Sequence, residues 1–164
     1  MRRKNPSSVE EEAYLTETEK TILKRPAVRT ARVLLVEDDV EMRNLLAWGL
    51  GADGYDVVEA KNGLEFYEHL MSSIRFPPAE GRDPNFDLIV SDIRLPGLTG
   101  LEVLASIRQH DKLTPVILIT AFGDEDTHAE AKQLGVSAVI DKPFDINHMR
   151  SVIRSMVSPR IPRV

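Results

Sequence analysis

The sequence has 164 residues, 42% hydrophobic and 29% charged, which is typical of one globular domain and excludes fibrous and largely disordered chains. Cysteine is absent, so disulfides and thiolate metal sites are excluded, and no apolar run approaches the roughly 20 residues of a membrane span. These absences predict no membrane contact and a cytoplasmic location. The net charge of -5 comes from the acidic residues 31–149, so we expect no direct contact with nucleic acid within this chain.

The chain divides into three parts by composition. We expect residues 1–30 to form a flexible N-terminal arm, residues 31–157 to form the folded domain, and residues 158–164, which contain two prolines, to form a C-terminal tail. Residues 75–86 contain three prolines and a glycine, which predicts an exposed excursion between a helix and a strand.

Five short runs rich in Val, Ile and Leu predict β-strands that are buried on both faces. They are residues 33–36, 57–58, 88–90, 116–119 and 138–140. Helical periodicity marks the segments between and after them, at residues 42–50, 67–74, 101–105 and 149–156, with a weaker apolar stripe at 124–134. The alternation predicts a doubly wound α/β fold, in which helices cover both faces of a five-stranded parallel sheet.

Polar side chains follow the predicted strands at the carboxyl edge of this sheet, where doubly wound folds bind their ligands. Glu37 and Asp38 follow the first strand, Asp92 the third, Thr120 the fourth and Lys142 the fifth. Carboxylates gathered at one edge repel one another, and a hard cation with oxygen ligands relieves this repulsion. The residues therefore predict a Mg²⁺ site without His or Cys ligands.

A carboxylate beside such a cation can attack phosphorus and form an aspartyl phosphate. Lys142 could pair with one phosphoryl oxygen, and the hydroxyl of Thr120 could donate to another. Each residue taken alone is more often a solvated charge or a satisfied hydroxyl, so the prediction depends on their convergence.

Four motifs together resemble those of the receiver domains of two-component response regulators. They are residues 33–43, the stretch Asp92-x-x-x-Pro96-Gly97-x-x-Gly100, Thr120-Ala121 and Lys142-Pro143, and the resemblance covers residues 31–157. It implies a receiver domain with the flavodoxin-like strand order 2-1-3-4-5. It also implies that Asp92 takes a phosphoryl group from a sensor histidine kinase or a histidine phosphotransfer protein.

The resemblance further assigns roles to the residues around Asp92. Glu37, Asp38 and Asp92 would bind Mg²⁺ together with the backbone carbonyl of Arg94. Lys142 would contact the phosphoryl group, and its peptide bond to Pro143 would be cis. Thr120 would shift toward the phosphate and so signal its presence. Signalling to a downstream protein target would use the face of the fourth helix, fifth strand and fifth helix, and homodimer formation stays open.

Two departures from the family pattern concern output and lifetime. Val139 stands three residues before Lys142, where many members carry Tyr or Phe, so the usual aromatic switch is missing. Arg94 and Phe122 are bulky at positions where the family controls the access of water to the acyl phosphate. We therefore hypothesise a long-lived phosphoryl group.

Three other functions compete with this one. A phosphohydrolase of the haloacid dehalogenase type would need an acidic residue two positions after Asp92, where Arg94 stands, so we do not expect an enzyme. A docking module with an idle site gains some weight from Val139. A DNA-binding regulator would need an effector domain outside these residues. The four histidines show no metal spacing, and Trp48, Arg150 and Arg154 are expected at the surface.

Overall fold

The computed structural model describes residues 28–75, 86–121 and 123–162 of the chain. Most of the predicted N-terminal arm and of the predicted excursion at residues 75–86 lies outside the described residues. Residues Thr30–Ile161 form one compact unit. The division into arm, folded domain and tail stays a prediction.

Five parallel strands form the central sheet in the order β3-β2-β4-β5-β6, which confirms the predicted doubly wound fold. Counting only these strands along the chain gives the flavodoxin-like order 2-1-3-4-5. Their bounds are β2 Arg32–Val36, β3 Asp56–Ala60, β4 Leu88–Asp92, β5 Val116–Thr120 and β6 Ala138–Asp141. The short strands β1 (Val28–Thr30) and β7 (Arg160–Pro162) pair in a second sheet.

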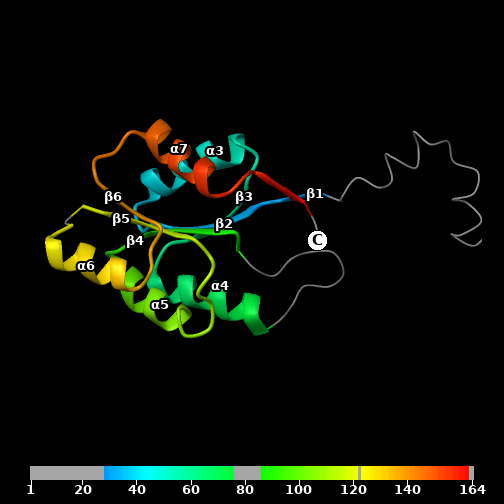
Figure 1. The fold of residues 1–164 in the computed structure, drawn as a ribbon. Coiled ribbons are helices and arrows are strands. Elements are labelled where there is room, and N and C mark those ends of the chain that lie inside the picture. The colour runs from blue at the N-terminus through cyan, green and yellow to red at the C-terminus, as the bar shows by residue number, and fades with distance from the viewer. Residues whose placement is uncertain (1–27, 76–85, 122, 163–164) are drawn as a thin grey trace, which may run out of the picture. The chain divides into compact units, whose positions relative to one another are not determined.

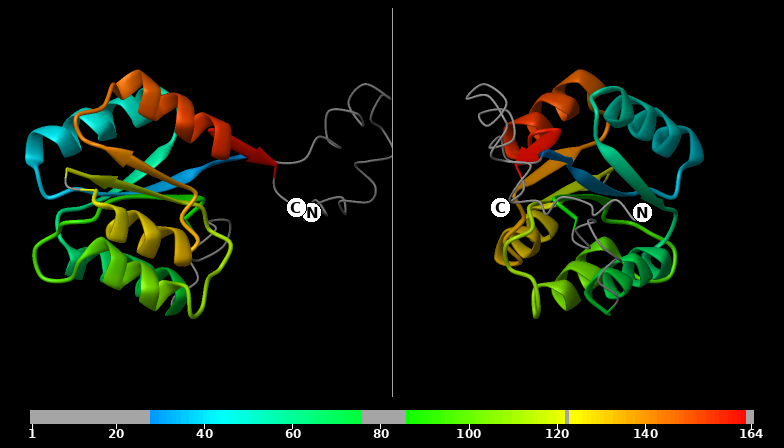
Figure 2. Two further views of the ribbon diagram at one scale, coloured as in Figure 1. Left: turned by 60° about the vertical axis from the view of Figure 1, so that its left-hand side comes forward. Right: turned by 90° about the vertical axis from the view of Figure 1, so that its right-hand side faces the viewer.

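Helices cover both faces of the central sheet, as predicted (Figure 1). They are α3 Val40–Ala52, α4 Gly63–Arg75, α5 Gly100–Ile107, α6 Glu125–Gln133 and α7 Ile146–Met156. Helices α3 and α7 lie on one face, and α4, α5 and α6 lie on the other, which both views of Figure 2 also show. Among the described residues, none of these helices combines the length and apolar character that crossing a bilayer requires.

Two hydrophobic clusters hold the layers together, because successive side chains of each strand point to opposite faces. Leu34 and Val36 of β2 belong to the cluster under α4, α5 and α6. Val33 and Leu35 of the same strand belong to the cluster under α3 and α7. All four side chains are fully buried, so β2 is a central strand covered on both faces.

The two edge strands are less buried than the sequence predicts. In β3, Asp56 and Glu59 are exposed and only Ala60 is buried. In β6, only Ile140 is buried. An edge strand pairs on one side only, so its apolar residues meet fewer neighbours than those of the fully buried strands β4 and β5.

Several helices begin with an acidic or hydroxyl cap directly beyond the carboxyl edge of the sheet. Asp39 accepts a hydrogen bond from the backbone N of Met42 at 2.7 Å and starts α3. Thr99 and Glu102 form a complete capping box at the start of α5. These caps fix the loops that follow β2 and β4, and those loops carry the site described next.

Candidate functional site

The parallel ladder brings the predicted site residues to one edge of the sheet. Glu37 follows β2, Asp92 ends β4, Thr120 ends β5 and Lys142 follows β6. Glu37, Thr120 and Asp92 have exposed fractions of 0%, 1% and 5%, although each is polar. Buried polar side chains require partners, so the contacts of these residues define the site.

Lys142 joins the two buried carboxylates. Its Nζ atom donates to Oδ2 of Asp92 at 2.6 Å and to Oε2 of Glu37 at 2.9 Å. Burial by itself lowers the pKa of Lys142, but the hydrogen bonds to Asp92 and Glu37 outweigh burial, and the pKa lies above its ordinary value. The lysine is therefore a fixed positive charge between two carboxylates that lie 55 positions apart in the sequence.

Glu37 lies deepest in the site. Burial raises the pKa of its carboxyl group above the ordinary value, although the hydrogen bond from Lys142 lowers it. Oε1 of Glu37 accepts from the backbone N of Asp39 at 3.2 Å, and Arg43 donates to the backbone oxygen of Glu37 at 2.8 Å. The loop between β2 and α3 is thus folded around this carboxylate.

Three carboxylates converge closely enough to share one cation. Glu37, Asp38 and Asp92 can each offer one oxygen, and these oxygens lie within 4.8 Å of one another. This all-oxygen set matches the preference of Mg²⁺, which takes one or two carboxylates and keeps several waters. Two of the three residues are buried and Asp38 is exposed, so the group opens to solvent on one side.

The backbone around Asp92 is held in place by close contacts. The backbone N of Arg94 donates to Oδ1 of Asp92 at 2.8 Å, and the hydroxyl of Ser91 donates to the backbone oxygen of Asp92 at 2.9 Å. A Cβ atom at Gly100 would lie 2.4 Å from that same backbone oxygen. Only glycine permits this approach of α5, which explains the last position of the predicted motif.

Thr120 and Lys142 are linked through their backbones. The backbone N of Lys142 donates to the backbone oxygen of Thr120 at 2.7 Å, and the peptide bond between Lys142 and Pro143 is cis, as expected. The structure thus brings Glu37, Asp92, Thr120 and Lys142 to one edge. Phe122 lies outside the described residues, and the side chain of Arg94 is exposed.

Two polar contacts were not predicted from the sequence. Nε2 of His128 lies 3.3 Å from Oδ1 of Asp141, which is the residue before Lys142. Asp53 pairs with both Arg150 and Arg154, of which Arg154 is exposed, as expected, while Arg150 is only partly exposed. Neither contact follows a known spacing, since the partners lie 13 and 97 or more positions apart.

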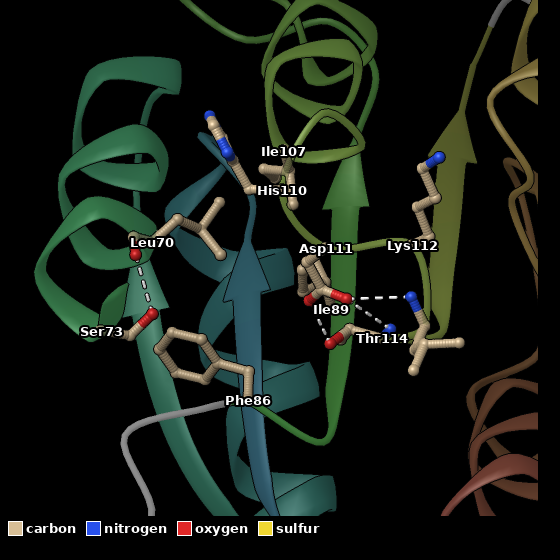
Figure 3. A pocket seen from close by; sticks show the side chains of 10 residues that line it. Leu70, Ser73, Phe86, Ile89, Ile107, His110, Asp111, Lys112 and Thr114 are labelled. Carbon is tan, nitrogen blue, oxygen red and sulfur yellow. Dashed lines mark hydrogen bonds between the residues drawn. The ribbon is translucent and has the colours of Figure 1, made fainter. Parts of the chain in front are cut away.

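A hollow of about 430 Å³ lies away from Glu37, Asp38 and Asp92. It is lined by Phe86, which precedes β4, by Ile89 of β4, by Ile107 at the end of α5 and by Leu70 of α4, together with polar residues such as Asp111 (Figure 3). This is the amino edge of the sheet, opposite the edge that holds Asp92. The hollow therefore belongs to a different part of the domain.

Comparison with known families gives a match over most of the chain. The family model described as "Response regulator receiver domain" matches residues 33–154. The chain is 30% identical over 123 residues to sporulation initiation phosphotransferase F of Bacillus subtilis, which covers 75% of this chain and 90% of that protein. It is also 30% identical over 123 residues to the regulatory protein AtoC of Escherichia coli, but spans only 24% of AtoC.

Solved structures show the same fold. The chemotaxis protein CheY4 of Vibrio cholerae aligns with a TM-score of 0.66 at 26% identity, covering 79% of this chain and 100% of that chain. The response regulator protein TrrA of Thermotoga maritima, solved in complex with Mg²⁺ and BeF, aligns with a TM-score of 0.64 at 28% identity, covering 77% and 99%. The family match at residues 33–154 includes Glu37, Asp38 and Asp92.

Proposed function

The chain belongs to the family of response regulator receiver domains, and from this premise we propose that Asp92 accepts a phosphoryl group and thereby carries a two-component signal. The donor is a phosphohistidine of a sensor histidine kinase or of a histidine phosphotransfer protein. One observation carries the proposal: the ammonium group of Lys142 lies 2.6 Å from a buried carboxylate oxygen of Asp92, beside two further carboxylates.

Asp92, Lys142 and Thr120 each have a separate role in phosphoryl transfer. An oxygen of Asp92 attacks phosphorus, the new O–P bond forms as the N–P bond of phosphohistidine breaks, and the electron pair of the broken bond returns to the imidazole. Lys142 then neutralises one phosphoryl oxygen, and the hydroxyl of Thr120 donates to another. Lys142 already contacts Asp92, so its ammonium needs only a short displacement to reach the new group.

Glu37, Asp38 and Asp92 fit a Mg²⁺ ion, and we assign them as its protein ligands with the backbone carbonyl of Arg94. The ion, when bound, supplies positive charge against the phosphoryl oxygens. Glu37 holds its place through Asp39 and Lys142, while the exposed Asp38 lies on the solvent side. The carboxylate oxygens that would bind Mg²⁺ therefore already lie close together in this chain.

Output passes to a downstream protein target through the face formed by α6, β6 and α7. Val139 of β6 is partly buried and packs against the hydrophobic cluster under α4, α5 and α6. Because this side chain is small and aliphatic, other contacts of the same face must couple phosphorylation to output.

Intact-protein mass after incubation with acetyl phosphate tests the proposal. Wild type should gain one phosphoryl group only when Mg²⁺ is present, and Asp92→Asn should gain none. The substitution keeps the shape of the side chain and removes carboxylate repulsion, so the variant should stay folded. Equal phosphoryl uptake by wild type and Asp92→Asn would overturn the assignment, and absence of uptake by both would favour an idle docking module.

A further inference from the structure

His128 of α6 and Asp141 of β6 form a polar contact next to the acidic site. Nε2 of His128 lies 3.3 Å from Oδ1 of Asp141, and their side chains are 40% and 62% exposed. The contact joins two elements of the face that we assign to output. Neither residue belongs to the predicted metal or phosphoryl site, and no part of the chemistry above uses them.

Gly123 lies directly against this contact. A Cβ atom placed on Gly123 would lie 2.4 Å from Nε2 of His128, 2.6 Å from Oδ1 of Asp141 and 2.9 Å from Cγ2 of Thr120. All three distances are below the closest approach that real Cβ atoms make. A side chain at this exposed position would therefore collide with both members of the His128–Asp141 pair and with Thr120, so Gly123 lies close to all three side chains.

The pair is also connected to the site from its other side. Asp141 directly precedes Lys142, whose ammonium binds Asp92 and whose backbone N donates to the oxygen of Thr120 at 2.7 Å. A route of direct contacts thus runs from Asp92 through Lys142 to Asp141 and His128, and returns past Gly123 to Thr120. A displacement of Thr120 toward Asp92 would therefore change the packing between Thr120, Gly123 and the pair.

We propose that the His128–Asp141 pair is a clasp that holds Gly123 and Thr120 in the arrangement seen here, so that phosphorylation at Asp92 must loosen it and thereby release α6. The inference rests on the proposed function. It makes His128 and Asp141 positioning residues, which act on the site through Thr120. The pair would also couple phosphorylation at Asp92 to the face of α6, β6 and α7 through a polar contact, in a chain that carries Val139 in place of an aromatic residue.

The clasp opposes occupancy of the site, so removing it should tighten the binding of a phosphoryl analogue. An exposed pair of this kind shifts an equilibrium by up to roughly fivefold. We therefore expect His128→Ala and Asp141→Asn to raise the affinity for beryllium fluoride roughly two- to fivefold in saturating Mg²⁺. His128→Gln keeps an N–H donor and should stay near the wild-type affinity.

Titration with beryllium fluoride, followed by ¹H–¹⁵N NMR spectra of the full chain, provides the test. Saturation of wild type should shift the ring signals of His128. His110→Ala serves as the matched control, because His110 is an exposed histidine at the amino edge of the sheet and its removal should leave the affinity unchanged. A second comparison removes His128 in a Thr120→Val background, where the gain in affinity should vanish because the clasp acts through Thr120.

The outcomes separate the two proposals. Binding of beryllium fluoride with unmoved His128 ring signals, or an equal gain in both backgrounds, overturns the clasp and leaves the proposed function standing. An unchanged or weaker affinity in His128→Ala also overturns the clasp. Failure of wild type to bind beryllium fluoride at all overturns the proposed function and the clasp together.

Discussion

The ammonium of Lys142 and the carboxylate of Glu37 are paired at 2.9 Å although the residues are 105 positions apart, and the carboxylate is fully buried. A buried carboxylate without a partner is strongly unfavourable, so this lysine stabilises the edge of the sheet as well as serving the proposed chemistry. The same ammonium binds Asp92, so Lys142 offsets the repulsion between two carboxylates at once.

Lys142→Met should therefore weaken both stability and phosphoryl uptake. The substitution keeps the aliphatic stem and removes the charge, and we expect a loss of about 1–3 kcal/mol in the free energy of unfolding at neutral pH in the presence of a chelator. Mg²⁺ should recover part of the loss, because it neutralises the same carboxylates. Urea unfolding with chelator and with Mg²⁺ measures both effects.

Lys112→Met is the control for this experiment, since Lys112 is exposed and lies at the amino edge of the sheet. It should change stability little under either condition. Equal stability of Lys142→Met and wild type in chelator would show that the carboxylates are compensated in another way.

Gly100→Ala should disturb the position of Asp92. The added methyl group would lie 2.4 Å from the backbone oxygen of Asp92 and 3.1 Å from the hydroxyl of Ser91, and the first of these contacts is with backbone, which cannot turn aside. We expect a destabilisation of about 1–3 kcal/mol and slower phosphoryl uptake from acetyl phosphate, measured by thermal unfolding and intact mass.

Gly51→Ala provides the opposite case in the same protein. Gly51 lies within α3 and a Cβ atom there would meet nothing within 4 Å, so the substitution should stabilise the chain by about 0.5–1 kcal/mol and leave uptake unchanged. Similar behaviour of the two variants would contradict the packing argument at Gly100.

The sequence predicts the central strands and the site edge well, for a physical reason. Strands β4 and β5 are buried on both faces, so each is an unbroken apolar run, and the ends of such runs place Asp92 and Thr120 at the carboxyl edge. The predicted strand at residues 57–58 was too short, because β3 continues through the exposed Glu59 to Ala60 at the sheet edge. Pairing on one side sustains a strand whose pattern is partly polar.

Long-range polar partners have no such signal in the sequence. The fold decides which side chains meet, and this produces the full burial of Glu37, the contact of His128 with Asp141 and the pairing of Asp53. The helical spacing of Arg150 and Arg154 shows that they share a face of α7 but not that this face meets α3. The partners of single polar residues at helix ends, such as Asp53, therefore could not be predicted from the sequence.

The side chain of Arg94 should control the lifetime of the phosphoryl group on Asp92. Arg94 is exposed two residues after Asp92, and its backbone N binds Oδ1 of Asp92. The pKa of Asp124 at the start of α6 is lowered first by hydrogen bonds from Thr127 and further by the charge of Arg94. A bulky side chain two residues after Asp92 should obstruct water that would approach the acyl phosphate.

Arg94→Ala should therefore shorten the half-life of the phosphorylated form severalfold, while uptake remains Mg²⁺-dependent. Loss of the added phosphoryl mass with time, after removal of acetyl phosphate, gives the half-life directly. Arg43→Ala is unsuitable as a control because Arg43 binds the loop of Glu37, whereas the exposed Arg160 is distant in sequence from every site residue and can be replaced instead. An unchanged half-life in Arg94→Ala would show that the Arg94 side chain does not keep water from the acyl phosphate.

Acid sensitivity should arise from Asp53 at the end of α3. Hydrogen bonds from Arg150, and then from Arg154, lower the pKa of Asp53 from 3.8 to about 2. The folded protein thus binds this proton less readily than the unfolded chain, so the stabilisation is fully present above pH 3.8 and is lost as the pH falls toward about 2. Solvent reaches Arg154, so we expect a contribution of about 1–2 kcal/mol at neutral pH.

Asp53→Asn should lower the free energy of unfolding by that amount at neutral pH, and its stability curve should approach that of wild type as the pH falls. Asp56→Asn is the matched control, because Asp56 pairs with Arg32 at 3.2 Å but is 56% exposed, and such surface pairs contribute under about 1 kcal/mol. Denaturant unfolding across this pH range measures the difference. A gap between Asp53→Asn and wild type that stays constant down to the acid limit would show that the pair stabilises α3 and α7 through packing rather than charge.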